Sequence, residues 1–134
     1  MFYRFDTEVP LRWVDVDSAG VVNNAVFLSL MEQARFSYFS HLGLMTDHRV
    51  PFVLAEANVQ WLRPGRLGMQ VTVAVATTRL GNSSFDMQYE IRNGDEVLCK
   101  AKASLVFVDA AMQPSPIPQD FRETLTQFEE LDAD

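Results

Sequence analysis

The sequence has very little cysteine and no long hydrophobic run. Cys99 is the single cysteine, so an intramolecular disulfide is impossible, which is typical of a reducing compartment and predicts a cytoplasmic location. No apolar run approaches the ~18–20 residues that a membrane-spanning helix needs. The first ten residues do not resemble a signal peptide. We therefore expect a protein without a membrane segment.

Potential metal ligands are equally scarce. The sequence has two histidines, His41 and His48, and one cysteine. The metal-ligand spacings His-x-x-x-His and Cys-x-x-Cys are absent. The Gly-x-Gly-x-x-Gly pattern of dinucleotide-binding loops is also absent. No Gly-x-Ser-x-Gly elbow is present, which disfavours an α/β-hydrolase-type esterase. From these absences we expect a protein that binds no metal ion and no redox cofactor.

Basic residues are outnumbered, with 11 Lys and Arg against 18 Asp and Glu and a formal net charge of −7. A general nucleic-acid-binding protein needs a basic surface, so we exclude nucleic acid as a partner. The length of 134 residues suits one domain, 1–134, and 48% hydrophobic residues are typical of a globular fold.

The longest stretch with helical character covers residues 21–42. Asn23 is the expected N-cap and Gly43 the expected stop. The apolar residues cover most of the helix circumference and leave only a thin polar stripe, on every fourth residue over 29–37. A helix that is apolar on most sides is buried on most sides, so we expect the rest of the chain to wrap around it.

The rest of the chain has the pattern of strands, followed by a short amphipathic helix over 119–131. The expected strands cover residues 7–16, 51–61, 70–79, 85–92 and 97–108. Gly81-Asn82 and Asn93-Gly94 are typical of tight hairpin turns. The sequence thus predicts an α+β fold, with one long buried helix wrapped by a curved antiparallel sheet of about five strands. The exposed edges of such a sheet favour a homodimer, and a homotetramer is also compatible.

The stretch before the long helix places a carboxylate, Asp17, in a glycine-containing loop. The first amides of a helix have no partner inside the helix and can donate to an anion or a polarised carbonyl. A carboxylate beside such amides suits acyl transfer. The alternative is that Asp17 and Asn23 only cap the turn and the helix, and spacing alone leaves both interpretations open.

A longer motif surrounds this loop and resembles a known family. Its residues are Asp15-Val-Asp17-x-x-Gly20-x-Val22-x-Asn24-x-x-Phe27, then Met31-Glu32-Gln-Ala34-Arg35. It resembles the hotdog-fold acyl-CoA thioesterases of the 4-hydroxybenzoyl-CoA thioesterase family, as does the later segment Val59-Gln-Trp-Leu-Arg63-Pro64-Gly65. The resemblance covers roughly residues 8–109. It implies a hotdog fold and hydrolysis of an acyl-CoA substrate to free acid and coenzyme A, with no cofactor.

The resemblance also implies roles for single residues. Asp17 would be the catalytic carboxylate, either as nucleophile or as general base toward water. The backbone amide of Asn24 would polarise the thioester carbonyl, and Gly20 would let the loop approach the substrate. The sequence departs from the family pattern at Val21, where many relatives have His, and at Asn24, where others have Tyr or His. The second departure leaves the amide role intact, because every residue but proline has an N–H.

Candidate substrate contacts follow from the needs of a coenzyme A ester. Basic residues and hydroxyls near strand ends suit its phosphates, although each alone is also an ordinary surface residue. The acyl pocket is expected at the dimer seam, between the helix and strand 51–61, with Phe52 and Trp61 as further apolar candidates. The substrate-binding candidates are Val21, Phe27, Arg63, Arg66, Arg79 and Ser84, with Lys100 and Lys102 as further cations.

Glu32 and Arg35 lie three residues apart on the apolar side of the helix. Buried charges are costly unless they are paired, so an internal ion pair is expected. His41 and His48 are expected to be structural or surface residues.

Three other functions stay open. The first is a non-catalytic acyl-thioester-binding protein, and the second is a thioesterase for acyl groups on a carrier protein. The third is a dehydratase or hydratase of the same fold. It ranks lowest because such enzymes pair the carboxylate with a histidine near the helix, whereas both histidines lie about a helix length from Asp17.

Overall fold

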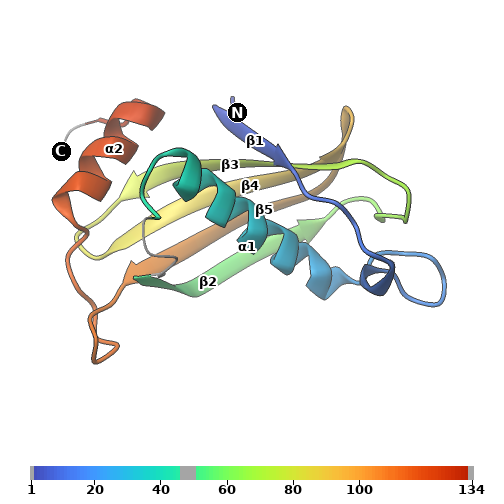
Figure 1. Ribbon diagram of the computed structural model, residues 1–134, viewed down its shortest axis with the longest axis horizontal. Helices are drawn as coiled ribbons and strands as arrows, with labels where there is room; N and C mark the ends of the chain where they lie inside the picture. Colours follow the sequence, from blue (N-terminus) through green and yellow to red (C-terminus); the bar gives the residue numbers. More distant parts are fainter. Residues whose placement is uncertain (1, 46–50, 133–134) are drawn as a thin grey trace.

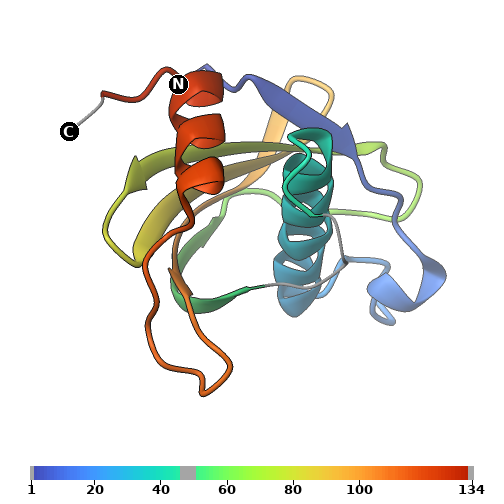
Figure 2. The same ribbon diagram turned by 60° about the vertical axis from the view of Figure 1, so that its left-hand side comes forward.

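The computed structural model describes residues 2–45 and 51–132. The five strands form one antiparallel sheet in the order β1-β3-β4-β5-β2. α1 lies across one face of the curved sheet and α2 lies at one end of it (Figures 1 and 2). The elements are β1 (Phe5–Glu8), the 3-10 helix η1 (Trp13–Asp15), α1 (Asn24–His41), β2 (Phe52–Trp61), β3 (Val71–Leu80), β4 (Ser84–Asn93), β5 (Glu96–Phe107) and α2 (Gln119–Glu129). The predicted α+β architecture is confirmed.

Local signals place most of these elements correctly. α1 begins directly after Asn23, whose side chain accepts a hydrogen bond from the Ala25 N–H at 2.9 Å, and it ends just before Gly43. The two predicted hairpins join β3 to β4 and β4 to β5. No helix in the described ranges is long and apolar enough to cross a membrane.

The first strand is shorter than predicted, so the expectation for residues 7–16 is wrong beyond Glu8. Pro10 has no N–H and cannot continue the ladder. The chain turns instead into η1, where the Arg12 N–H donates to Asp15 Oδ2 at 2.7 Å. Asp15 is buried in this turn, whereas Trp13 in the same turn is 78% exposed.

α1 is buried on fewer sides than the sequence predicts. Its backbone lies closest to β1 and β3, and its buried side chains are Phe27, Leu30, Met31, Ala34, Tyr38 and Phe39. On the side toward β2, Leu28 and Phe36 stay 40% and 38% exposed. Most of β2 is exposed as well. Among the described residues of one chain, therefore, the sheet packs on one side of the helix and leaves much of the β2 side uncovered.

Five aromatic rings meet at the end of the sheet where α1 ends. They come from α1, β2, β4, β5 and α2, and neighbouring ring centroids lie 4.7–6.3 Å apart. We call this set the phenylalanine cluster: Phe39, Phe52, Phe85, Phe107 and Phe121. Rings at these separations add edge-to-face attraction to apolar burial, and the cluster attaches α2 to the core.

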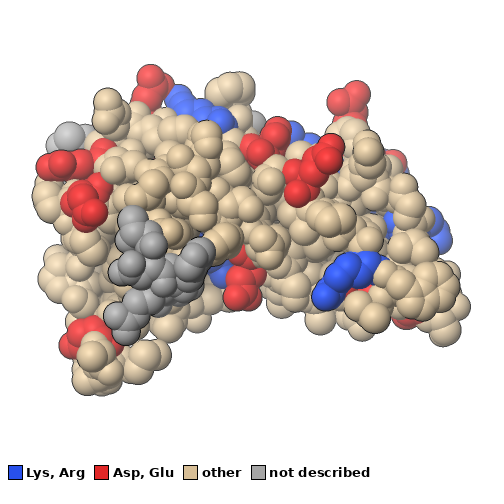
Figure 3. Space-filling model, in the orientation of Figure 1, with Lys and Arg blue, Asp and Glu red and all other residues tan. Residues whose placement is uncertain are grey.

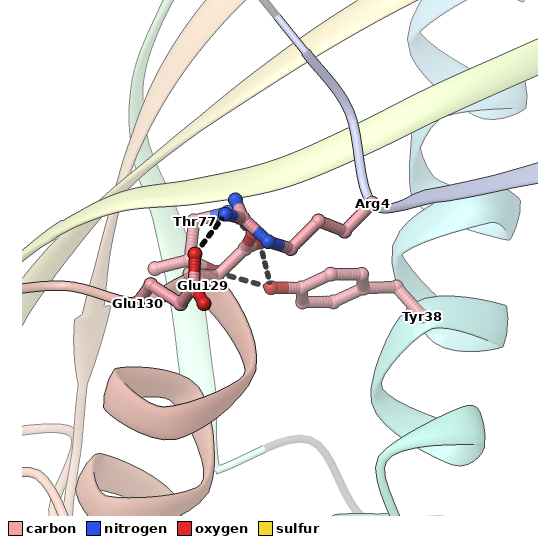
Figure 4. A network of polar contacts seen from close by, with 5 residues as sticks. All are labelled: Arg4, Tyr38, Thr77, Glu129 and Glu130. Atoms are coloured by element: carbon pink, nitrogen blue, oxygen red, sulfur yellow. Dashed lines mark hydrogen bonds and ion pairs between the residues drawn. The ribbon is translucent and has the colours of Figure 1, made fainter.

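A buried carboxylate attaches the other end of α2 (Figure 4). Glu129 Oε2 accepts hydrogen bonds from the Tyr38 hydroxyl at 2.6 Å and from the Thr77 N–H at 2.8 Å. Arg4 lies 3.9 Å from the other oxygen and also pairs with Glu130. Burial and the nearby carboxylate raise the pKa of Tyr38, so its hydroxyl stays protonated. We call this contact, formed by Glu129 with Tyr38 and Thr77, the Glu129 clasp.

Candidate functional site

Asp17 opens a tight loop directly before α1. Its Oδ1 accepts hydrogen bonds from the Ala19 N–H at 2.9 Å and the Val21 N–H at 3.2 Å, and its own N–H donates to the Val21 carbonyl at 2.9 Å. Gly20 has φ +76°, which L side chains rarely adopt, so this turn favours glycine. The side chain of Asp17 is exposed, and within the described residues its Oδ2 has no partner. One carboxylate oxygen is therefore available to a ligand.

The start of α1 lies next along the chain and offers a hydrogen-bond donor. The Ala25 N–H is capped by Asn23, and the Val26 N–H donates to the Asn23 carbonyl at 2.9 Å. The N–H of Asn24, the first helical residue, has no partner in the part of the chain that the structure describes. Partial positive charge gathers at this end of a helix. The carboxylate and the free N–H are thus joined by one short loop.

The loop between β2 and β3 packs on the Asp17 loop and holds it. The Val22 N–H donates to the Gly65 carbonyl at 2.7 Å. A Cβ added at Gly65 would lie 3.0 Å from the Val22 side chain and 3.3 Å from the Phe27 ring, so glycine allows this close approach without displacing either side chain. Phe27, expected to contact substrate, is 2% exposed and supports the loop from inside. Gly65 was missed as a site residue, and its signal was the Pro64-Gly65 pair.

One of the predicted phosphate ligands, Arg66, lies beside this site. Val21 and Arg66 form an isolated antiparallel bridge, which places Arg66 next to the Asp17 loop. Its side chain is exposed and has no ion pair within the described ranges. Arg63, on the same β2–β3 loop, lies 3.9 Å from the carboxylate of Glu96. The structure thus brings Arg66 to the Asp17 loop, and Arg63 lies three residues before it on the same β2–β3 loop.

The other predicted ligands lie elsewhere in the chain. Arg79 is at the far end of β3, eight residues after Val71, or about 25 Å along the strand. It pairs with Asp86 at 2.7 Å and donates to Ser84 at 3.2 Å, and this contact lowers the pKa of Asp86. Within one chain the structure therefore separates Arg79 and Ser84 from Asp17. Lys100 and Lys102 line a polar groove formed by the strands.

A largely apolar cavity of about 250 Å³ lies between α1 and β2, and we call it the α1–β2 pocket. Its apolar walls include Phe36, Phe39, Phe52, Leu54 and Leu105. Charged groups on α1, Glu32 and Arg35, also line it. Figure 3 shows the α1 face of the molecule, on which isolated charged groups are separated by broad uncharged areas.

The expected ion pair between Glu32 and Arg35 is not formed among the described residues. Arg35 instead donates to the hydroxyl of Tyr89 on β4 at 2.9 Å. Burial raises the pKa of Tyr89, so the phenol stays neutral and accepts this bond. Arg35 therefore pairs with the Tyr89 hydroxyl on the sheet and not with Glu32 on its own helix.

The histidines and the cysteine have no described contact with the Asp17 loop. His41 is exposed and stacks near the ring of Phe5, with centroids 5.3 Å apart, whereas His48 lies outside the described residues. Cys99 is buried, and burial raises the pKa of its thiol to about 11. Across residues 2–45 and 51–132, no three His, Cys, Asp or Glu side chains are grouped to hold a metal ion.

The sequence is similar to those of known thioesterases and CoA-thioester hydrolases. The sequence model of the thioesterase-like superfamily matches residues 11–125, which include the Asp17 loop. A 1,4-dihydroxy-2-naphthoyl-CoA hydrolase of Nostoc punctiforme is 28% identical over 106 residues, covering 75% of this chain and 72% of that protein. The acyl-CoA thioester hydrolase YbgC of Escherichia coli is 29% identical over 122 residues, covering 86% and 90%.

Solved structures agree with this similarity. A thioesterase of Thermus thermophilus, described as complexed with coenzyme A and Zn, is 37% identical and has a TM-score of 0.86. The match covers 96% of each chain.

The Arg12–Asp15 contact that holds η1 gives a prediction for acid stability. The Arg12 guanidinium donates a hydrogen bond to Asp15 Oδ1 at 2.9 Å, and this bond lowers the pKa of Asp15 although burial opposes it. A carboxyl with a lowered pKa stabilises the fold above its ordinary pKa, and this contribution is lost as the pH falls. We expect Asp15→Asn to lower the free energy of unfolding at neutral pH and to flatten its decline below about pH 4, as measured by urea unfolding across a pH series.

The matched variant is Arg12→Met, which removes the same pair from the other side. It should flatten the acid decline as well, and the double variant should resemble either single one. An acid decline in Asp15→Asn as steep as that of the wild type would contradict this role.

Proposed function

The chain belongs to the thioesterase-like superfamily, and from this membership we propose that it hydrolyses an acyl-coenzyme A thioester to the free acid and coenzyme A. The observation that carries the proposal is the Asp17 carboxylate, whose free oxygen lies in the loop leading to the unpartnered N–H of Asn24. Relatives named as CoA thioester hydrolases support the substrate class.

The proposed chemistry uses these two groups in turn. The Asn24 N–H, at the positive end of α1, donates to the thioester carbonyl and stabilises the negative charge that develops on its oxygen. Asp17 either attacks the carbonyl carbon, which gives a mixed anhydride that water cleaves, or takes a proton from an attacking water. In both routes the carbon–sulfur bond breaks and coenzyme A leaves as the thiol.

Arg66 is the proposed contact for the phosphates of coenzyme A, with Arg63 beside it. Its bridge to Val21 places it next to the reacting loop, and its guanidinium is exposed and unpaired among the described residues. A guanidinium binds phosphate oxygens through charge-assisted hydrogen bonds. The Thermus thermophilus relative, solved as a complex with coenzyme A, supports coenzyme A as the ligand.

We also propose a homodimer formed through β2. This strand is a ten-residue edge of the sheet, and Val53, Leu54 and Trp61 on it are at least 36% exposed. An exposed apolar edge strand is a template for pairing, and a second antiparallel β2 would cover it. The homotetramer and the cytoplasmic location stay predictions.

The proposed pairing would complete the site. Within one chain, Glu32 and Arg35 at the α1–β2 pocket lie eight and eleven residues after Asn24, or about 12–17 Å along the helix. Pairing two antiparallel β2 strands along their length places the Phe52 end of one beside the Trp61 end of the other. The pocket of one copy then lies near the Asp17 loop of the other and receives the acyl group.

A second candidate function rests on a second loop with the same geometry. Asp109 Oδ1 accepts hydrogen bonds from the Ala111 N–H at 2.9 Å and the Gln113 N–H at 3.0 Å. Met112 has φ +61°, as Gly20 has φ +76°. The same turn thus forms where no helix follows directly, so turn geometry alone does not make a carboxylate reactive. A non-catalytic acyl-thioester-binding protein is therefore the second candidate.

The Asp109 loop supplies a matched control for the catalytic role of Asp17. Asp17→Asn keeps the oxygen that accepts the turn hydrogen bonds but removes the charge. We expect it to lower kcat by about 10²–10⁴-fold, whereas Asp109→Asn should leave thiol release within about twofold of the wild type. Thiol release from acyl-CoAs, followed with a thiol-reactive dye, measures both. Equal rates in Asp17→Asn and the wild type would rule out the catalytic role.

The phosphate contact is tested by a pair of arginine variants. Losing a charged hydrogen bond costs about 1.5–3 kcal/mol, so Arg66→Ala should raise the KM for acyl-CoA about 10–100-fold. The KM for the same acyl group on N-acetylcysteamine, which has no phosphate, should stay unchanged. Arg79→Ala is the control and should change neither value. An equal rise for both thioesters would show that Arg66 does not bind phosphate.

The β2 interface is tested by a charge on the exposed edge. Leu54→Lys should convert a species of twice the 15.2 kDa chain mass into one of 15.2 kDa in sedimentation analysis, and thiol release should fall with it because the site is shared. Phe2→Lys, which also replaces an exposed apolar side chain but precedes β1, is the control. A monomeric wild type, or a dimeric Leu54→Lys, would contradict pairing through β2.

A further inference from the structure

The α1–β2 pocket ends at aromatic rings. Phe39 and Phe52 line it, together with Leu105, and these three side chains are at most 5% exposed. Phe39 and Phe52 also belong to the phenylalanine cluster, whose rings pack directly behind them. The pocket therefore has an apolar floor with no opening on the far side at these residues.

Phe121 of α2 supports this floor from behind. Its ring centroid lies 5.1 Å from that of Phe39, 6.3 Å from that of Phe52 and 4.7 Å from that of Phe107. Phe121 itself is 4% exposed. A ring that touches the two phenylalanines of the floor fixes how far they can retreat, because close-packed interiors tolerate little displacement.

α2 is in turn held at both of its ends. Near its beginning, Arg122 donates to the carbonyl of Gly81 in the β3–β4 hairpin. Near its end, the Glu129 clasp joins it to Tyr38 on α1 and Thr77 on β3 (Figure 4). The second helix thus holds Phe121 at a fixed distance from α1.

We propose that Phe121, positioned by the Glu129 clasp, sets the longest acyl group that the α1–β2 pocket accepts. The proposal rests on the proposed function, because it assigns this pocket to the acyl group. A volume of about 250 Å³ holds about eight groups of ~30 Å³ each. The substrate class is therefore short-chain or single-ring acyl-CoA, with an apolar end against the phenylalanine floor.

The test compares length profiles of thiol release from straight-chain acyl-CoAs of two to sixteen carbons. The wild type should show a sharp fall in kcat/KM beyond about eight carbons, the length set by the pocket volume. Phe121→Leu and Phe121→Ala should move this limit to longer chains and raise the decanoyl-to-hexanoyl ratio of kcat/KM about tenfold, the lower end of the effect of added methylenes in an apolar pocket. The leucine variant covers the case in which the alanine variant does not fold.

Phe128→Ala is the matched control on the same helix. Phe128 contacts Tyr38 and His41, with centroids 6.0 and 6.3 Å apart, and does not join the rings behind the pocket. It should leave the length limit unchanged, because Phe121 and the Glu129 clasp stay in place. Glu129→Ala should move the limit in the same direction as Phe121→Leu, and Glu129→Gln, which keeps an oxygen acceptor, should restore the wild-type limit.

A binding series separates this inference from the proposed function. Affinity for the same acyl-CoAs is measured by calorimetry in the Asp17→Asn background, with and without Phe121→Leu. A shifted binding limit without thiol release in the wild type would overturn the hydrolase and keep the inference. The inference would be overturned if the longest acyl group accepted by Phe121→Leu were the same as that of the wild type, both in thiol release and in binding. Wild-type kcat/KM that stays level up to sixteen carbons would also overturn it.

Discussion

Burial of five phenylalanine rings at one end of the sheet is the interaction on which the rest of the structure depends. α1, β2, β4, β5 and α2 each contribute one ring. Full burial of such a side chain stabilises a fold by about 1.5–3 kcal/mol relative to exposure, and no other contact among the described residues joins these five elements at one point. The cluster fixes the C-terminal end of α1 and attaches α2. The start of the helix is left to be positioned by the loops at the opposite end of the sheet.

That opposite end is held by close backbone approach. The Gly65 carbonyl accepts a hydrogen bond from the Val22 N–H at 2.7 Å, and a Cβ at Gly65 would press against the side chains of Val22 and Phe27. This contact sets the loop that carries Asp17 against the start of the helix. The hydrogen bonds of Asp17 recur at Asp109, so the difference between the two carboxylates is one of surroundings. Of these two, only Asp17 precedes a helix whose first N–H, that of Asn24, has no partner among the described residues, and such a group strengthens interaction with a developing anion.

The side of the molecule over β2 is the least covered part of the fold. α1 packs mainly on β1 and β3, so the inner face of β2 and the outer side of α1 share an apolar opening. The position of α1 nearer to β1 and β3 than to β2 also leaves the space of the α1–β2 pocket. A helix centred on the sheet would fill this space and leave no room for an acyl group. The feature that exposes apolar surface is therefore also the one that makes a pocket, which is why the proposed dimer and the proposed acyl site concern the same strand.

The sequence by itself determined the elements that depend on neighbours along the chain. Asn23 and Gly43 marked the ends of α1, and the pairs Gly81-Asn82 and Asn93-Gly94 marked the hairpins, because caps and turns use hydrogen bonds within a few residues. The glycine-containing loop before the helix indicated the candidate site for the same reason. The first strand was predicted too long because Pro10, which cannot join a ladder, was overlooked.

Only the tertiary structure decided which distant residues meet. Arg66 joins the Asp17 loop whereas Arg79 lies a strand length away, since the β2–β3 loop folds back on that loop. Arg35 takes a partner 54 residues away, the Tyr89 hydroxyl, in place of Glu32 on the same helix. Glu129 reaches Tyr38 across 91 residues. Such contacts depend on how the two helices pack on the sheet and on strand register, and the packing surface is assembled from segments whose local patterns carry no information about one another.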